Sequence, residues 1–69
     1  MPPVLANAVV DVIKPSNPNN LGIFKVEVWG RDPYDYTRTY EITAKNDTMA
    51  AQQGIARFVK EMEQLAQKD

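Results

Sequence analysis

The sequence predicts an α+β fold in which a three-stranded antiparallel sheet carries one C-terminal helix on one face, in the order β-β-β-α. Two observations lead to this prediction. Apolar and polar residues alternate along two segments, residues 23–30 and 36–44, which a short turn separates. The last third of the chain instead repeats its apolar residues at helical spacing. With 69 residues, the chain is expected to form a single domain over residues 1–69.

The first strand is predicted over residues 4–13, VLANAVVDVI, which are rich in Val and Ala without helical spacing. Residues 14–22, KPSNPNNLG, follow with two prolines, three asparagines and a glycine, all of which favour turns. This connection is longer than the roughly two to five residues of a usual hairpin loop. The sequence leaves open whether it is a binding loop or a disordered tip.

Residues 23–30, IFKVEVWG, and 36–44, YTRTYEITA, are predicted to pair as an antiparallel hairpin. Between them, the order of Asp32, Pro33 and Asp35 favours a type I turn, with Pro33 suited to the first central position.

The register of this hairpin follows from the need to bury one apolar face. If Arg31 lies opposite Asp35, the helix-covered face carries the pairs Gly30–Tyr36, Val28–Arg38, Val26–Tyr40 and Phe24–Ile42. The other face then carries the pairs Trp29–Thr37, Glu27–Thr39 and Lys25–Glu41, the last with opposite charges across from one another. Trp29 is therefore expected on the face away from the helix, with Val9 or Ile13 of the first strand near it.

The remaining segment, from Asn46 to the end of the chain, is predicted to be a helix, which Asn46 or Asp47 can cap. Its expected apolar stripe consists of Met49, Ala51, Ile55, Phe58, Val59, Met62, Leu65 and Ala66. Gly54 lies within this helix, where it costs about 1 kcal/mol relative to alanine. A close approach of the helix to the sheet would offset that cost, and a contact with a partner is the alternative.

Composition argues against catalysis, cofactors and metal sites. The chain has no histidine and no cysteine, and so lacks the commonest general base, the thiol nucleophile and the usual zinc ligands. Its only serine, Ser16, lies between two prolines with no base nearby in sequence. Asp32 and Asp35 flank a turn, where capping and solvation explain them. We therefore expect no catalytic residues, no cofactor and no metal.

The charge balance and hydropathy narrow the class of partner. Eight basic and nine acidic residues give a net charge of −1, whereas nucleic-acid-binding domains usually carry a basic excess. No segment reaches the ~20 apolar residues of a membrane helix, and the N-terminus does not resemble a signal peptide. We expect a cytoplasmic protein that does not contact a membrane.

Five aromatic and basic residues gather at one end of the hairpin and are predicted to bind a partner: Trp29, Arg31, Tyr34, Tyr36 and Arg38. Trp, Tyr and Arg are enriched in binding hot spots, and a purely structural role is the alternative. The sequence thus predicts a small binding protein without enzymatic activity. It would bind a protein partner or itself through the Trp29 face and the hairpin tip, and self-association could also use the edge of the first strand. Forming a homodimer would also support the small core of so short a chain.

A nucleic-acid-associated protein is the second candidate, with the hairpin aromatics as stacking platforms and the arginines on phosphates. Glu27, Asp32, Asp35 and Glu41 alternate with those cations and would repel a phosphate backbone. A structural module without a ligand is the third candidate.

The segment from residue 23 onward resembles the β-β-β-α course of double-stranded-RNA-binding domains, through TAKNDTMAAQQGIARFVKEMEQL. That family's last helix starts with adjacent lysines that contact phosphates, where this chain has Asn46, Asp47 and Thr48. The family's first helix also has no counterpart, so the resemblance does not extend to RNA binding. The small size, aromatic hairpin and AAQQGIARF helix also resemble phage and prophage accessory proteins, which implies binding to a host protein.

Overall fold

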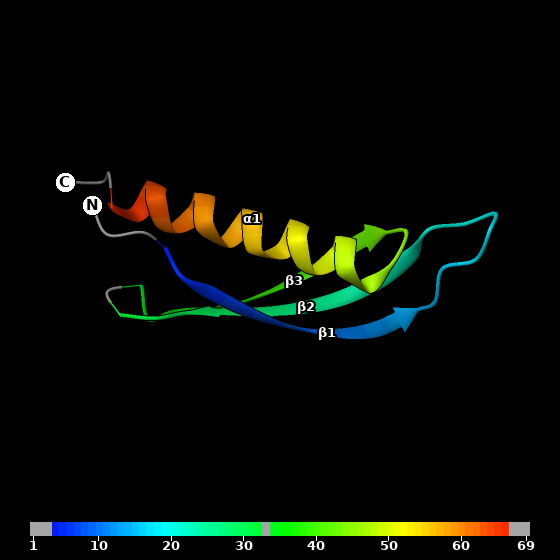
Figure 1. The fold of residues 1–69 in the computed structure, drawn as a ribbon, viewed down its shortest axis with the longest axis horizontal. Helices are drawn as coiled ribbons and strands as arrows, with labels where there is room; N and C mark the ends of the chain where they lie inside the picture. Colours follow the sequence, from blue (N-terminus) through cyan, green and yellow to red (C-terminus); the bar gives the residue numbers. More distant parts are fainter. Residues whose placement is uncertain (1–3, 33, 67–69) are drawn as a thin grey trace.

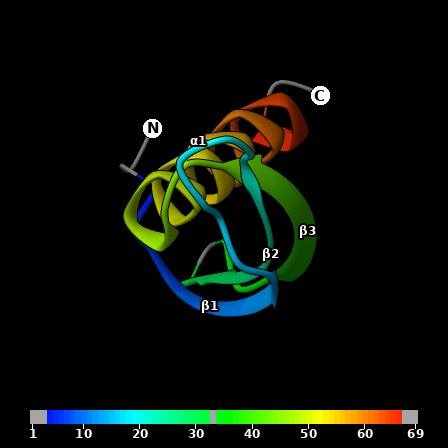
Figure 2. The same ribbon diagram turned by 90° about the vertical axis from the view of Figure 1, so that its right-hand side faces the viewer.

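The computed structural model describes residues 4–32 and 34–66 and has the predicted order of three strands and one helix (Figure 1). Strand β1 spans Ala6–Lys14, β2 spans Gly22–Gly30, β3 spans Thr37–Ala44, and helix α1 spans Asp47–Ala66. The strands form one antiparallel sheet in the order β1-β2-β3, so β2 is central and β1 and β3 are the two edges. The sheet curls around α1, which fills its concave side (Figure 2). No other described element covers the opposite face.

The β2–β3 hairpin has the predicted register. Phe24 lies opposite Ile42, Lys25 opposite Glu41 and Trp29 opposite Thr37. The ladder closes where the Gly30 N–H donates to the Tyr36 carbonyl at 3.1 Å. Burial of the face that carries Phe24 and Ile42 fixes this register, because a slip of one residue would expose the whole apolar set.

The paired residues of β2 and β3 end at Trp29 and Thr37, before the turn in which Arg31 was expected opposite Asp35. The Arg31 carbonyl accepts the Tyr34 N–H at 2.7 Å, while the Arg31 N–H donates to the Leu5 carbonyl at 3.3 Å. Arg31 therefore continues the pairing of β2 with β1 and lies opposite Leu5. The predicted role of Pro33 lies outside the described residues.

Strand β1 pairs with β2 along its length, with Asn7 opposite Trp29 and Val10 opposite Val26. It begins two residues later than predicted and ends one residue later, at Lys14. A bulge between Val12 and Lys14 makes Ile13 an extra residue in the ladder.

The long connection after β1 contains its own tight turn. Asn17 and Asn20 exchange backbone hydrogen bonds of 3.0 and 3.2 Å. The Asn17 side-chain oxygen accepts the N–H groups of Asn19 and Asn20, both at 2.9 Å. The segment therefore extends the β1–β2 hairpin beyond the start of α1 (Figure 1), and the expected turn chemistry is used within the loop.

The core lies between α1 and the concave face of the sheet. It comprises Phe24, Val26, Val28, Tyr34, Ile42, Ala44, Ala50, Phe58 and Met62. The helix contributes residues four apart, so the buried stripe runs through Ala50, Gly54, Phe58 and Met62. Met49 and Leu65, which were expected in this stripe, are 40% and 41% exposed.

Gly54 marks the closest approach of helix and sheet. A Cβ atom built on Gly54 would lie only 2.6 Å from Cγ1 of Val26, much closer than two carbons can pack. The expected close packing of α1 on the sheet at this glycine is therefore present, and it requires a residue without a side chain.

The first turn of α1 has the capping pattern that the sequence indicates. The Asn46 side-chain oxygen accepts the Met49 N–H at 2.8 Å, and its backbone carbonyl accepts the Ala50 N–H at 3.1 Å. Of the two candidates, Asn46 is thus the N-cap. Asp47 is the first helical residue, where its charge favours the helix dipole.

Candidate functional site

The five residues predicted to bind a partner do not form one surface. Trp29 is half-buried on the face away from the helix, and Arg31 is exposed at the turn. Tyr34 is only 7% exposed and belongs to the core. Tyr36 and Arg38 lie on the helix side of β3, because Arg38 is opposite Val28 and side chains alternate along a strand.

Arg38 is bound within the molecule, at the border between β3 and α1. Its Nε atom forms an ion pair with Glu61 of the helix at 3.2 Å, and Nη1 donates to the Thr37 carbonyl at 3.0 Å. Its guanidinium also lies 5.5 Å from the centroid of the Tyr36 ring, within cation–π range. The Tyr40 hydroxyl donates to the second oxygen of Glu61 at 2.8 Å. Polar contacts therefore close this side of the helix–sheet layer.

The two ionisable partners in this network have shifted pKa values. Burial, together with the hydrogen bond to the Glu61 carboxylate, raises the pKa of Tyr40 to about 12. The hydrogen bond from Tyr40, with the Arg38 guanidinium as a further cause, lowers the pKa of Glu61. Both shifts favour the neutral phenol and the ionised carboxylate, which is the arrangement of a structural contact.

We define the open face as the convex sheet surface that α1 does not cover. It consists of four cross-strand rows: Asn7–Trp29–Thr37, Val9–Glu27–Thr39, Asp11–Lys25–Glu41 and Lys14–Ile23–Thr43. Two lysines face three carboxylates in this set, so the open face has no basic excess. Its large apolar side chains are Val9, Ile23 and Trp29, and Val9 is 48% exposed.

The expected apolar patch around Trp29 is present in part. Val9 lies in the row next to Trp29 on the same face, within reach of a diagonal contact. Ile13 lies in the bulge at the other end of β1 and is 56% exposed, so it is far from Trp29 along the sheet.

The free edge of β1 is the second unoccupied surface. The bond from Arg31 to Leu5 shows that the odd-numbered residues from Leu5 to Asp11 direct their backbone groups to β2. The N–H and C=O groups of the alternate residues, Ala6, Ala8, Val10 and Val12, therefore point outward. Four of the exposed large apolar side chains also lie on or next to this strand: Leu5, Val9, Val12 and Ile13.

A hollow of about 320 Å³ lies between β1 and the first half of α1. Val10, Ala51 and Ile55 supply its apolar walls, and the polar side chains of Thr48 and Gln52 also line it. The half-buried Ala6 and Ala8 continue the helix-covered face of β1 from Val10 toward the start of the strand. The β1 side of the layer is thus apolar and open, whereas polar contacts close the β3 side.

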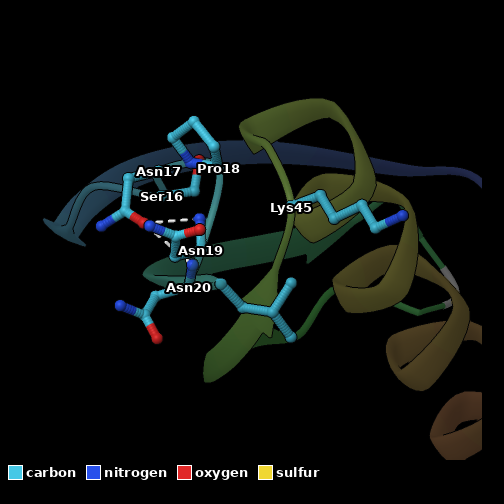
Figure 3. A pocket seen from close by; sticks show the side chains of 7 residues that line it. Ser16, Asn17, Pro18, Asn19, Asn20 and Lys45 are labelled. Carbon is cyan, nitrogen blue, oxygen red and sulfur yellow. Dashed lines mark hydrogen bonds between the residues drawn. The ribbon is translucent and has the colours of Figure 1, made fainter.

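A second hollow, of about 380 Å³, lies beside the Asn17–Asn20 turn and is a candidate site for a small molecule. Figure 3 shows the Asn17 side chain engaged with the backbone of its own turn, while the Lys45 side chain extends away from the asparagines. Polar groups do not converge here on a common point, as a small-molecule site requires.

Within residues 4–32 and 34–66, no group of three or more potential metal ligands is found. No helix in the same part of the chain is long and apolar enough to cross a membrane. Comparison of the chain with known protein families, curated proteins and solved structures finds no match. The function must therefore be inferred from the two unoccupied surfaces.

The sequence predicted that Trp29 lies on the open face. The other four predicted binding residues were assigned to the same surface only because they lie near Trp29 in the chain. The predicted register already placed Arg38 opposite Val28, on the face away from Trp29. The alternation of side chains along the two strands could therefore have shown that Arg38 and Trp29 lie on opposite faces. The outward backbone groups of β1 depend on strand order, which the sequence does not define.

Proposed function

We propose that this protein is a protein-binding module without enzymatic activity, and that the open face is its contact surface. The observation that supports the proposal is a whole sheet face that no element within residues 4–32 and 34–66 covers, and this face holds the chain's only tryptophan. Trp29 and Val9 form an apolar centre there, and charged and hydroxyl side chains surround it. This combination of an aromatic anchor and a polar rim is typical of protein interfaces.

A protein partner fits this surface better than a nucleic acid. Asp11, Glu27 and Glu41 outnumber the two lysines of the open face, and Arg38 is bound to Glu61 on the other side. Phosphate binding by this face would require a basic excess that it does not have. An apolar centre with mixed charges around it instead suits a partner with its own exposed apolar side chain.

The proposal is tested by affinity capture from a lysate of the organism that encodes the chain. The bait proteins are wild type, Trp29→Ala and a matched control, Gln53→Ala, which changes an exposed helix residue on the opposite side of the molecule. We expect the same discrete proteins on wild type and on the control, and their loss with Trp29→Ala, at both low and high salt. Circular dichroism must show that Trp29→Ala remains folded.

Two results would contradict the proposal. One is an identical set of captured proteins on all three baits. The other is capture of nucleic acid that weakens steeply as salt rises, which would favour the nucleic-acid alternative.

A further inference from the structure

The free edges of the sheet are protected to different degrees. At β3, the pairing of Gly30 with Tyr36 directs the backbone of Thr37 outward. The Arg38 guanidinium donates a hydrogen bond to the outward Thr37 carbonyl. A charged side chain that blocks an edge group is one of the ways in which proteins prevent edge-to-edge pairing.

Strand β1 is protected only at its end, where the bulge and Lys14 lie. From Ala6 to Val12 it contains no lysine, arginine or proline, and Asp11 is the only charged residue of that stretch. Ala6, Ala8, Val10 and Val12 present their N–H and C=O groups to the edge in a regular ladder. A strand with such an edge and exposed apolar side chains pairs readily with another strand.

The side chains of β1 are complementary to themselves in one antiparallel register. The two copies are related by a twofold axis perpendicular to the sheet, which keeps each side chain on its own face. Because residues that lie opposite one another share a face, the axis must pass between a residue and its own copy in the second chain. An axis at Val9 matches polar with polar and apolar with apolar residues. It gives the pairs Val9–Val9, Asn7–Asp11, Ala8–Val10 and Ala6–Val12 between two copies, with Leu5 level with the Ile13 bulge.

Neighbouring registers are less favourable. An axis at Val10 sets Asp11 against Val9 and Asn7 against Ile13. An axis at Ala8 sets Asp11 against Leu5, and an axis at Asp11 opposes two like charges, which is destabilising. Only the Val9 axis gives Asp11 a hydrogen-bonding partner, the Asn7 amide.

The hollow between β1 and α1 has a matching occupant in this arrangement. The strand of the second copy would place its Ala8 beside Val10, at the foot of the hollow that Ala51 and Ile55 line. The Ala8 methyl group would then add an apolar contact to the walls that Val10, Ala51 and Ile55 supply.

We propose that the β1 edge binds a second copy of this chain, with antiparallel β1 strands centred on Val9, to form a six-stranded sheet. Backbone hydrogen bonds between Ala8 and Val10, and between Ala6 and Val12, join the two copies. Both helices then lie on one side of the sheet and the two open faces form a continuous surface on the other. This dimer is held by the backbone edge of β1, whereas the proposed partner contact is the open face. The two share the Val9 side chain but not their hydrogen bonds or Trp29, so either proposal can fail alone.

Disulfide trapping tests the register directly, because the natural chain has no cysteine. At the axis, the two Val9 Cα atoms would lie about 4.5 Å apart as a non-hydrogen-bonded pair, within the range that a disulfide spans. We expect Val9→Cys to form a covalent dimer with oxidised glutathione. Asn7→Cys is the matched control, since its two copies would be offset by four residues, about 13 Å along the strands.

Charge substitutions test the interface without a covalent link. Val9 and Thr39 flank Glu27 on the open face, from β1 and β3. In analytical ultracentrifugation, wild type and Thr39→Lys should be dimers at about 100 μM, whereas Val9→Lys, which opposes two like charges at the axis, should be a folded monomer.

Three results would overturn the dimer. Wild type could be a monomer at 100 μM, or Asn7→Cys could cross-link as fully as Val9→Cys. Alternatively, both lysine variants could dissociate the dimer, which would locate self-association on the open face. None of these results depends on the capture of other proteins, so they leave the proposed function to its own test.

Discussion

Gly54→Ala tests the packing of α1 on the sheet, because two effects of opposite sign compete at this position. In an exposed helix, replacing glycine with alanine stabilises by about 1 kcal/mol. Here the new methyl group would lie 2.6 Å from Cγ1 and 3.1 Å from Cβ of Val26. Carbon atoms pack at about 3.5–4.0 Å, so the helix must move by roughly 1 Å or Val26 must change its conformation.

Val26 has little freedom to adapt. It is fully buried in the central strand and is β-branched, which restricts its rotamers. Overpacking of this kind costs about 1–3 kcal/mol. We therefore expect Gly54→Ala to lower the free energy of unfolding by about 0–2 kcal/mol, after subtraction of the gain in helix propensity.

Urea denaturation followed by circular dichroism, at one protein concentration, measures this change. The comparison of Gln53→Gly with Gln53→Ala supplies the propensity term at an exposed neighbouring position, and the glycine variant should be less stable than the alanine variant by about 1 kcal/mol. In the double variant Gly54→Ala with Val26→Ala, the lost methyl groups make room, so the two effects should sum to less than the separate changes. A stabilisation of about 1 kcal/mol by Gly54→Ala alone would refute the close approach.

Two further predictions concern the core and the Glu61 contact. Phe58→Ala should lower the free energy of unfolding by about 3–5 kcal/mol, since Phe58 is fully buried; a loss below 1 kcal/mol in urea denaturation would show that this face is not the core. Folding lowers the pKa of Glu61, so its contribution to stability is present above its unfolded pKa of about 4.5 and is lost as pH falls through its lower folded value. Folding raises the pKa of Tyr40 to about 12, so its contribution is present below pH 10 and is lost as pH rises toward 12. In a plot of melting temperature against pH, Glu61→Gln should flatten the acid side and Tyr40→Phe the alkaline side. The effects at pH 7 should be small because Glu61 is 40% exposed. Profiles identical to that of wild type would exclude this coupling.

The hairpin was predictable from the sequence because its alternation leaves one register that buries Phe24, Val26 and Ile42 together. The helix was predictable in kind, but its buried stripe is shifted. Ala50 and Gly54 are small, and hydropathy alone does not show that they lie at the closest contact with the sheet. Met49 and Leu65 are large and apolar, and yet they are exposed outside the core between helix and sheet.

The two candidate surfaces were less predictable than the fold. Tyr34 follows a turn, where no periodicity indicates which way a side chain points, and the ring enters the core. The β1 edge could not be identified at all before the strand order was known. A first strand placed next to β3 would have had different outward groups and a different free edge.

Amide hydrogen exchange at β1, followed by NMR during dilution, tests most directly whether the edge is an interface. The amides of Val9 and Asp11 bond to β2 and should be protected at every concentration. The amides of Ala8 and Val10 point outward and should be protected only at high concentration, where the second copy covers them. Fast exchange of Ala8 and Val10 at all concentrations, with Val9 and Asp11 still protected, would show that the edge is free and would contradict the account.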